Sequence, residues 1–159
     1  MWETLGFSNG CGLATPQINY PVKLFIIDSK NTYQNMDNLN RQKYFDGDEG
    51  IKETFINAEI VEYENDFIVS DDEGCLSIPN LWAPVNRPWK ITIQYYDAQF
   101  QKQTQTYSGY TARVIQHEYD HTIGILYIDR IEPLRKKILQ KKLIRIAKEV
   151  NQVKYPMIK

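Results

Sequence analysis

The two histidines of the chain stand four residues apart, in the segment His117-Glu118-Tyr119-Asp120-His121. In an α-helix this spacing is close to one turn, so both imidazoles project from one face and can bind a single metal ion. The glutamate directly after the first histidine then lies beside the ion, where it can accept a proton from water. The segment therefore predicts the metal site of a hydrolase, with His117 and His121 as ligands and Glu118 as general acid/base.

A third ligand is needed, because a catalytic metal site of this kind usually has three protein ligands and one open position. One class of zinc protease has a histidine six residues after the second, where this chain has Tyr127; another uses a downstream glutamate, for which Glu132 and Glu149 are the candidates. Cys75 is the better candidate, because it follows a predicted strand within the segment 72–77 (DEGCLS). A thiolate would bring negative charge and a soft donor to the ion.

A glycine-containing segment, Gly10-Cys11-Gly12 followed by Leu-Ala-Thr-Pro and Gln17, precedes the first predicted strand. The glycines let the main chain lie close to a ligand, and the amide of Gln17 can donate a hydrogen bond to an oxyanion. A Gly-x-Gly is otherwise commonly just a turn. The segment lacks a Lys-Ser/Thr ending and a preceding strand, which argues against a phosphate-binding loop.

Strands must position these segments. They are predicted where β-branched and aromatic residues recur, at 22–28, 54–64, 66–70, 91–96 and 101–107, with a hairpin turn at Asp97-Ala98-Gln99 between the last two. The polar segment 29–53 is expected to be a long exposed excursion, either partly mobile or with a short helix of its own.

Two helices follow the strands. The first is predicted from about Thr111 to a stop at Gly124 and carries both histidines. The second begins at Glu132-Pro133 and continues to about Val150, with an apolar stripe formed by Leu139, Leu143, Ile146, Ala147 and Val150. We therefore predict one α+β domain over residues 1–159, with antiparallel or mixed β-sheets around a central helix and a C-terminal helix packed over the sheet.

The composition is that of an ordinary globular protein. The 159 residues are 42% hydrophobic and 25% charged, with a net charge of -1 and two cysteines. No apolar run approaches the roughly 20 residues that span a bilayer, and the charge balance gives no bulk attraction to nucleic acid or acidic lipid. No secretory signal is apparent, so we expect a cytoplasmic protein without a membrane partner, whose cysteines are ligands or packed thiols.

Taken together and in this order, the three segments resemble the motifs of peptide deformylase, which are G-x-G-L-A-A-P-Q, E-G-C-L-S and Q-H-E-x-D-H-L-x-G. They stand here at 10–17, 73–77 and 116–124, and the following segment 125–130 (ILYIDR) is similar to the family's continuation. The helical C-terminus resembles one branch of the family. Thr15 and Thr122 depart from the usual alanine and leucine, and Trp82 stands where some members have an arginine.

The resemblance implies that Cys75, His117 and His121 hold one divalent metal ion, ferrous iron in cells and replaceable by zinc, nickel or cobalt. It also implies a substrate, the N-formylmethionyl end of a nascent peptide. Glu118 would take a proton from water as the formyl carbon is attacked and would pass it to the departing amine, with release of formate.

The resemblance implies roles for the surroundings of the metal as well. The Gln17 side chain and the Leu76 backbone N–H would stabilise the negative oxygen of the intermediate. The methionine side chain would enter a recess formed by Val114 and Tyr110. The peptide backbone would pair like an added strand along Cys11 and Gly12.

The family has a further N-terminal segment before its first motif. We therefore expect Trp2, Leu5 and Phe7 to end a helix whose earlier turns are absent, and to pack on the body of the protein. We also expect an uncovered apolar surface that favours self-association.

Three rival interpretations stay open. The first is a zinc protease with a glutamate as third ligand, and the second is a non-catalytic relative that only binds metal or formyl-peptide. The third is an adaptor that contacts the ribosome through the basic side of the last helix, although such a side is commonly just the solvated face of an amphipathic helix. That side consists of Arg135, Lys136, Lys137, Lys141, Lys142, Arg145 and Lys148.

Overall fold

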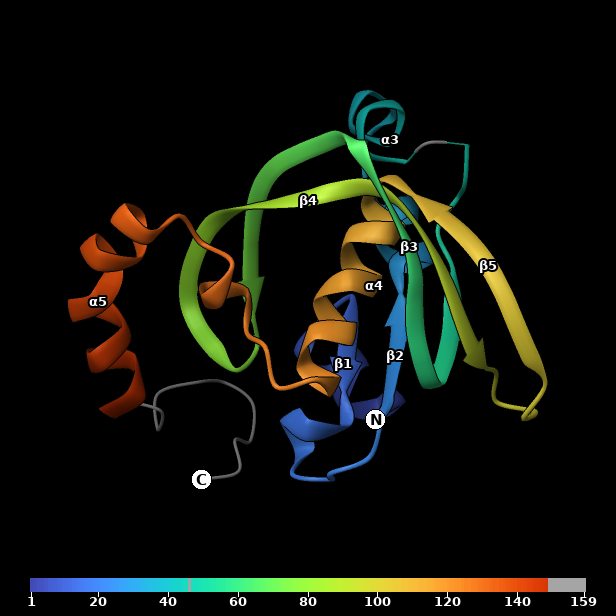
Figure 1. Ribbon diagram of the computed structural model, residues 1–159, viewed down its shortest axis with the longest axis horizontal. Coiled ribbons are helices and arrows are strands. Elements are labelled where there is room, and N and C mark those ends of the chain that lie inside the picture. Colours follow the sequence, from blue (N-terminus) through green and yellow to red (C-terminus); the bar gives the residue numbers. More distant parts are fainter. Residues whose placement is uncertain (46, 149–159) are drawn as a thin grey trace.

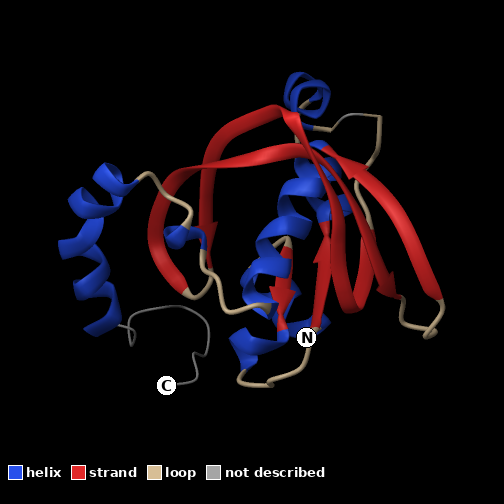
Figure 2. Ribbon diagram, in the orientation of Figure 1, coloured by secondary structure: helices blue, strands red, loops and turns tan. Residues whose placement is uncertain are grey.

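The computed structural model describes residues 1–45 and 47–148. Within them, one antiparallel sheet has its strands in sequence order, so each strand pairs with the next along the chain. The strands are β1 (Gly12–Ala14), β2 (Leu24–Asp28), β3 (Lys52–Cys75), β4 (Ile78–Tyr96) and β5 (Lys102–Ser108). Together with the helices they form the predicted α+β fold (Figure 2).

The polar segment after β2 contains two short helices, α2 (Ser29–Asn35) and α3 (Asn38–Tyr44), where the sequence predicted an excursion with one helix at most. Each helix begins after an aspartate. The side chain of Asp28 accepts a hydrogen bond from an N–H of the first turn of α2, and Asp37 does the same for α3. These caps satisfy backbone donors that a short helix would otherwise leave exposed.

β3 and β4 form a long ribbon that arches away from the rest of the sheet (Figure 1). The predicted strands 54–64 and 66–70 are parts of β3, which continues through several register shifts. Residues 78–90 of β4 lie outside the predicted strands, and the presence of Pro79, Pro84 and Pro88 weakens the strand signal there. Among the described residues β5 pairs with residues 90–96 of β4 and no strand covers the rest, so the ribbon portion of β4 has an open edge, and edge strands tolerate proline.

Helix α4 (Gly109–Thr122) is the predicted central helix and packs on β1, β2, β4 and β5 (Figure 1). Ala112 and Ile115 are fully buried in the main hydrophobic cluster, which also contains the stacked rings of Phe25 and Phe55. The helix ends just before Gly124, whose φ of 76° suits a glycine at a helix stop. This packing fixes the face of α4 that carries the histidines.

A second hydrophobic cluster lies between the ribbon and the C-terminal helix α5 (Pro133–Lys148). Leu139, Leu143 and Ile146 of the predicted stripe pack against it, whereas Ala147 is exposed. The predicted end of the helix at Val150 lies outside the described residues. None of the described helices combines the length and the apolar character needed to cross a membrane.

The first helix, α1 (Trp2–Ser8), packs on the body only in part. Leu5 is buried in a third cluster, and Lys52 lies over the ring of Trp2. Phe7 is 73% exposed, so the expectation that all three apolar residues pack on the body is wrong for Phe7. The side of a single helical turn that faces the sheet is too narrow to take both Leu5 and Phe7.

Candidate metal centre

The end of β3 and one face of α4 bring three donor side chains together. The ligand atoms of Cys75, His117 and His121 all lie within 4.8 Å of one another, and Cys75 Sγ is 3.2 Å from His121 Nε2. Among the described residues, no other group of three or more such donors is clustered in this way. One sulfur and two imidazole nitrogens match the donor set and number that a catalytic transition-metal ion takes from a protein.

The three rival positions for a third ligand do not gain support. Tyr127 is buried and its hydroxyl donates to the carbonyl of Leu81. Glu132 is exposed and belongs to no donor cluster formed by described residues. Glu149 lies outside the described residues.

Cys75 is held as a thiolate by its neighbours. Burial by itself would raise the pKa of the thiol, but hydrogen bonds with His117 and His121 outweigh burial and lower the pKa to about 5. The side-chain amide of Gln17 also lies 3.6 Å from the sulfur. A deprotonated sulfur is the form that binds a metal ion.

Glu73 orients the ring of His117, and the sequence did not predict this role. Its carboxylate lies 3.0 Å from His117 Nδ1, which leaves the other ring nitrogen for the metal. Arg87 and Arg113 both donate to the same buried carboxylate. Burial would raise the pKa of Glu73, but these contacts with Arg87 and His117 hold it well below its usual value. Its place two residues before Cys75 in a strand was the available signal.

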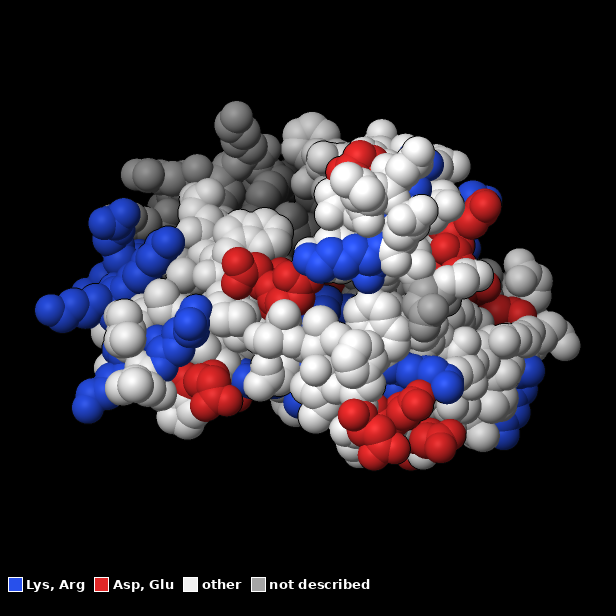
Figure 3. All heavy atoms as spheres, turned by 90° about the horizontal axis from the view of Figure 1, so that it is seen from above, with Lys and Arg blue, Asp and Glu red and all other residues white. Residues whose placement is uncertain are grey.

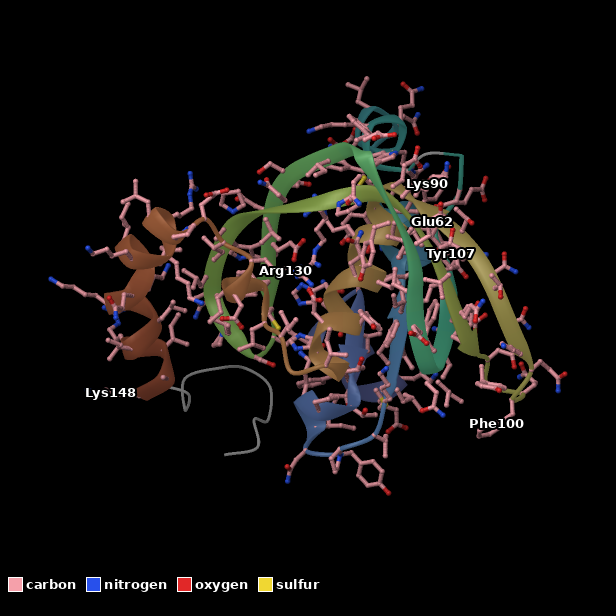
Figure 4. All side chains as sticks on the ribbon, viewed as in Figure 1. Glu62, Lys90, Phe100, Tyr107, Arg130 and Lys148 are labelled. Atoms are coloured by element: carbon pink, nitrogen blue, oxygen red, sulfur yellow. The ribbon has the colours of Figure 1, made fainter. Side chains whose placement is uncertain are left out.

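A second carboxylate joins this ion-pair network to the loop after α4. Asp120 is 2% exposed and accepts hydrogen bonds from Arg87 and from Arg130. Arg130 comes from the segment that follows the 3₁₀ helix η2 (Tyr127–Asp129), and Figure 4 shows it between the ribbon and α4. The contacts therefore run from Arg130 through Asp120, Arg87 and Glu73 to His117.

Glu118 lies beside the donors in a nearly closed space. It is 4% exposed, and its Oε2 has no hydrogen-bond partner among the residues that the structure describes. A Cβ on Gly12 would lie 2.5 Å from its Oε1, so glycine is the residue that lets β1 pass this close. Burial raises the pKa of Glu118 to about 7, against the opposing effect of His117 and His121. A carboxyl group with such a pKa can both accept and release a proton near neutrality.

Gln17 lies in the 3₁₀ helix η1 (Thr15–Ile18), directly after β1. Its carbonyl oxygen accepts a hydrogen bond from the Ala14 N–H, and its NH₂ group points to Cys75 and Ser77. Leu76 lies beside them in the turn that joins β3 to β4. The two predicted oxyanion donors thus come from separate elements, and both residues line the cleft described below.

A cleft of about 1370 Å³ opens onto these residues. Its lining includes every residue predicted to contact substrate, namely Cys11, Gly12, Tyr110 and Val114, together with His117 and Glu118. Tyr110 and Cys11 are hydrogen-bonded to each other, which explains how two polar groups are accommodated in this apolar wall. The hydroxyl groups of Thr15 and Thr122, which stand in place of the usual alanine and leucine, also have hydrogen-bond partners, since both donate to backbone carbonyls.

Comparisons with known proteins agree on one family. The family model for polypeptide deformylase matches residues 1–137. Peptide deformylases from Flavobacterium psychrophilum and Christiangramia forsetii are each 41% identical to this chain, with 99% of the chain and 79% of the relative covered.

Solved structures give the same result. An inhibitor complex of Arabidopsis thaliana peptide deformylase 1B is similar with a TM-score of 0.78 and 28% identity, covering 96% of this chain and 76% of that one. An inhibitor complex of the Plasmodium falciparum enzyme has a TM-score of 0.74 and 29% identity, covering 93% and 80%.

Proposed function

The chain belongs to the peptide deformylase family, and we propose that its reaction is carried out by the donor cluster, Glu118 and Gln17. Members of this family remove the formyl group from nascent peptides in a metal-dependent hydrolysis. The observation that carries the assignment of residues is the position of Glu118. Its Oε2, for which the described part of the chain supplies no hydrogen-bond partner, is buried beside three donor atoms that lie within 4.8 Å of one another.

Cys75, His117 and His121 would hold the divalent metal ion that the family uses. When bound, such an ion supplies an acidified water molecule and polarises a carbonyl group. We propose ferrous iron as the ion in cells, with zinc, nickel or cobalt as replacements, because a thiolate and two imidazoles suit all of these ions. An X-ray absorption spectrum of the metal-loaded protein should show a sulfur neighbour of the metal. A spectrum with nitrogen and oxygen neighbours alone would exclude Cys75 as a ligand and favour the protease interpretation.

Glu118 would move the proton. As a carboxylate it takes a proton from the attacking water, and as a carboxylic acid it gives that proton to the nitrogen of the departing amine. The position supports this role, because no hydrogen bond from the described residues competes for Oε2 and the buried side chain still lines the cleft. Formate and a peptide with a free N-terminus result.

Gln17 and Leu76 would stabilise the oxygen that becomes negative in the tetrahedral intermediate. The Gln17 NH₂ group is already directed toward the cluster, because the Ala14 N–H holds the other end of the same amide. A donor fixed before the reaction needs no reorganisation when charge develops.

The open edge of β1 would hold the peptide. Within the described ranges β1 pairs with β2 alone, so the backbone near Cys11 and Gly12 can pair with an added strand on its other side. Val114 and Tyr110 line the same cleft and would form the recess for the methionine side chain.

The decisive experiment is formate release from formyl-Met-Ala-Ser by protein loaded anaerobically with ferrous iron. We expect catalytic turnover that depends on the loaded metal. A protein that binds the ion stoichiometrically and releases no formate would instead be a non-catalytic relative, and cleavage between amino acids would indicate a protease.

Nascent peptides emerge in the cytoplasm, where we place the reaction, and α5 is a candidate contact with the ribosome. Its basic side chains gather at one end of the molecule (Figure 3). Association with ribosomes that weakens steeply with added salt would support the contact, whereas salt-independent or absent association would leave α5 as a solvated helix. Self-association stays a prediction, to be measured by light scattering across a concentration series.

A further inference from the structure

The outward face of α5 carries two large apolar side chains in addition to its basic ones. Leu139 and Leu143 pack inward on the second hydrophobic cluster. Leu134 and Ile138 are 75% and 73% exposed, and their spacing of four residues places them side by side on the helix surface. The spacing between Leu134 and Leu143 places these two on opposite sides of the helix. A helix that only covered the core would have no need of apolar residues on its outward face.

Positive and negative charges are segregated between α5 and β3. α5 contains seven basic residues and no acidic one, whereas β3 contains eight acidic residues and a single lysine. The acidic residues are Glu53, Glu59, Glu62, Glu64, Asp66, Asp71, Asp72 and Glu73. Because the whole chain has a net charge of only -1, two copies meet without strong overall repulsion, and surfaces of opposite sign can attract each other.

Part of this acidic charge lies on the outward face of the ribbon. Glu62 and Glu64 flank the position of β3 that is opposite Ile91, which is 1% exposed and points to the core. Since side chains alternate along a strand, both glutamates point away from the core. Asp66 follows them and is exposed. The carboxylates therefore form one accessible acidic surface.

Two apolar side chains come directly after these carboxylates. Phe67 and Ile68 are 57% and 52% exposed, at a register shift of the β3–β4 pairing. The ring of Phe67 lies against that of Trp89 with 5.7 Å between centroids, so it has a fixed position. An apolar pair beside acidic residues is the counterpart in size and charge of Leu134 and Ile138 beside basic residues.

The two surfaces are far apart within one copy. Figure 4 shows Glu62 and Lys148, the last residue of α5, at opposite sides of the molecule. α5 is also fixed to its own chain by its inward face, and Lys136 pairs with Asp129 of η2. A contact between the outward face of α5 and the acidic surface therefore needs a second copy.

We propose that α5 of one copy docks on the outward face of β3 of a second copy, in a two-fold symmetric dimer. Leu134 and Ile138 would meet Phe67 and Ile68, with lysines of α5 against the carboxylates around them. Two-fold symmetry makes each contact occur twice, so both basic helices and both acidic surfaces are used. The charges would select the partner surface and speed the encounter, and the apolar pairs would add buried area. This inference goes beyond the proposed deformylase activity and does not depend on it.

The first test is light scattering across a concentration series at low and at raised salt. We expect a dimer at low salt, with a Kd that rises at least about tenfold when salt is added, because the paired charges lie near the surface. A protein that is monomeric at every concentration, or a dimer whose Kd does not respond to salt, would overturn the proposal.

The second test exchanges the charges. The double variants Lys137→Glu/Lys141→Glu on α5 and Glu62→Lys/Asp66→Lys on β3 should each raise Kd at least about tenfold, because like charges then meet in both contacts of the dimer. An equal mixture of the two variants should associate again, since each helix then finds a surface of opposite sign. A mixture that stays monomeric, or a single variant that dimerises normally, would contradict the proposed contact.

The matched control is Lys30→Glu/Lys102→Glu, which reverses the same amount of charge at exposed lysines outside both surfaces and should leave Kd unchanged. An unchanged Tm of each variant shows that the chain still folds. The ribosome is the alternative occupant of α5. If the variant of α5 loses ribosome binding while the unchanged protein stays monomeric, the second copy is excluded as the occupant.

Discussion

At the scale of single residues, the environment of Glu118 separates its chemical role from a structural one. No described residue forms a hydrogen bond with its Oε2, so replacing the carboxylate by an amide breaks no such bond at that atom. We predict that Glu118→Gln keeps the metal but lowers turnover by at least about 100-fold, because an amide cannot shuttle a proton. Metal content and formate release are measured on the same sample.

A matched control for this variant is Glu132→Gln, at an exposed glutamate that one class of zinc protease would use as third ligand. It should retain both metal and turnover. If Glu118→Gln works at the normal rate, Glu118 has no part in the mechanism.

Gly12 is a second residue at which the effect of a substitution depends on a single contact. The added Cβ of Gly12→Ala would lie 2.5 Å from Glu118 Oε1, and the glutamate must move to make room. We predict at least about a tenfold loss of kcat with normal metal content, since misplacement of a catalytic group by about 1 Å has large effects on rate. Gly6→Ala is the control, because no described residue outside its own helix backbone lies within 4 Å of the new Cβ. Equal kcat in both variants would show that Glu118 can move aside for the added Cβ without loss of catalysis.

At the scale of elements, buried charges join the ribbon, α4 and the segment after η2. Arg87 and Asp120 are each 2% exposed and directly paired. Removing the charge of Asp120 leaves two arginines with one acceptor fewer. We predict that Asp120→Asn lowers the free energy of unfolding by about 3 to 5 kcal/mol, the usual effect of breaking a buried pair.

Urea unfolding of the variant measures this loss. Lys136→Gln serves for comparison, because it breaks the exposed pair of Lys136 with Asp129 and should cost less than about 1 kcal/mol. Similar small effects of both changes would mean that the buried network contributes little to holding these elements together.

At the scale of the whole molecule, the donors connect β3 to α4, so metal binding should stabilise the complete fold. An ion that binds only the folded state adds about 4 kcal/mol when its free concentration is a thousand times Kd. We predict that a chelator lowers Tm and that resupplied metal restores it.

The same measurement on Cys75→Ala distinguishes the ligand sets. The shift in Tm on metal addition should be much smaller in this variant, because one of three donors is gone. A full shift would mean that another residue completes the site, as the protease interpretation requires.

The sequence by itself determined the central helix, the two histidines on one of its faces and the glutamate between them, because helical periodicity is a local property of the chain. It also indicated the glycine segment and Cys75, whose neighbours in the sequence form compact motifs. Only the tertiary structure decided that Glu73, Arg87 and Asp120 form one network behind His117, since these residues are far apart in the chain and meet through strand pairing and helix packing. Only the tertiary structure decided that residues 78–90 form a strand, because they pair with β3 at an open edge in spite of their prolines. The place of Trp82 over Gly74 also depends on the tertiary structure, because it is set by the register of two strands.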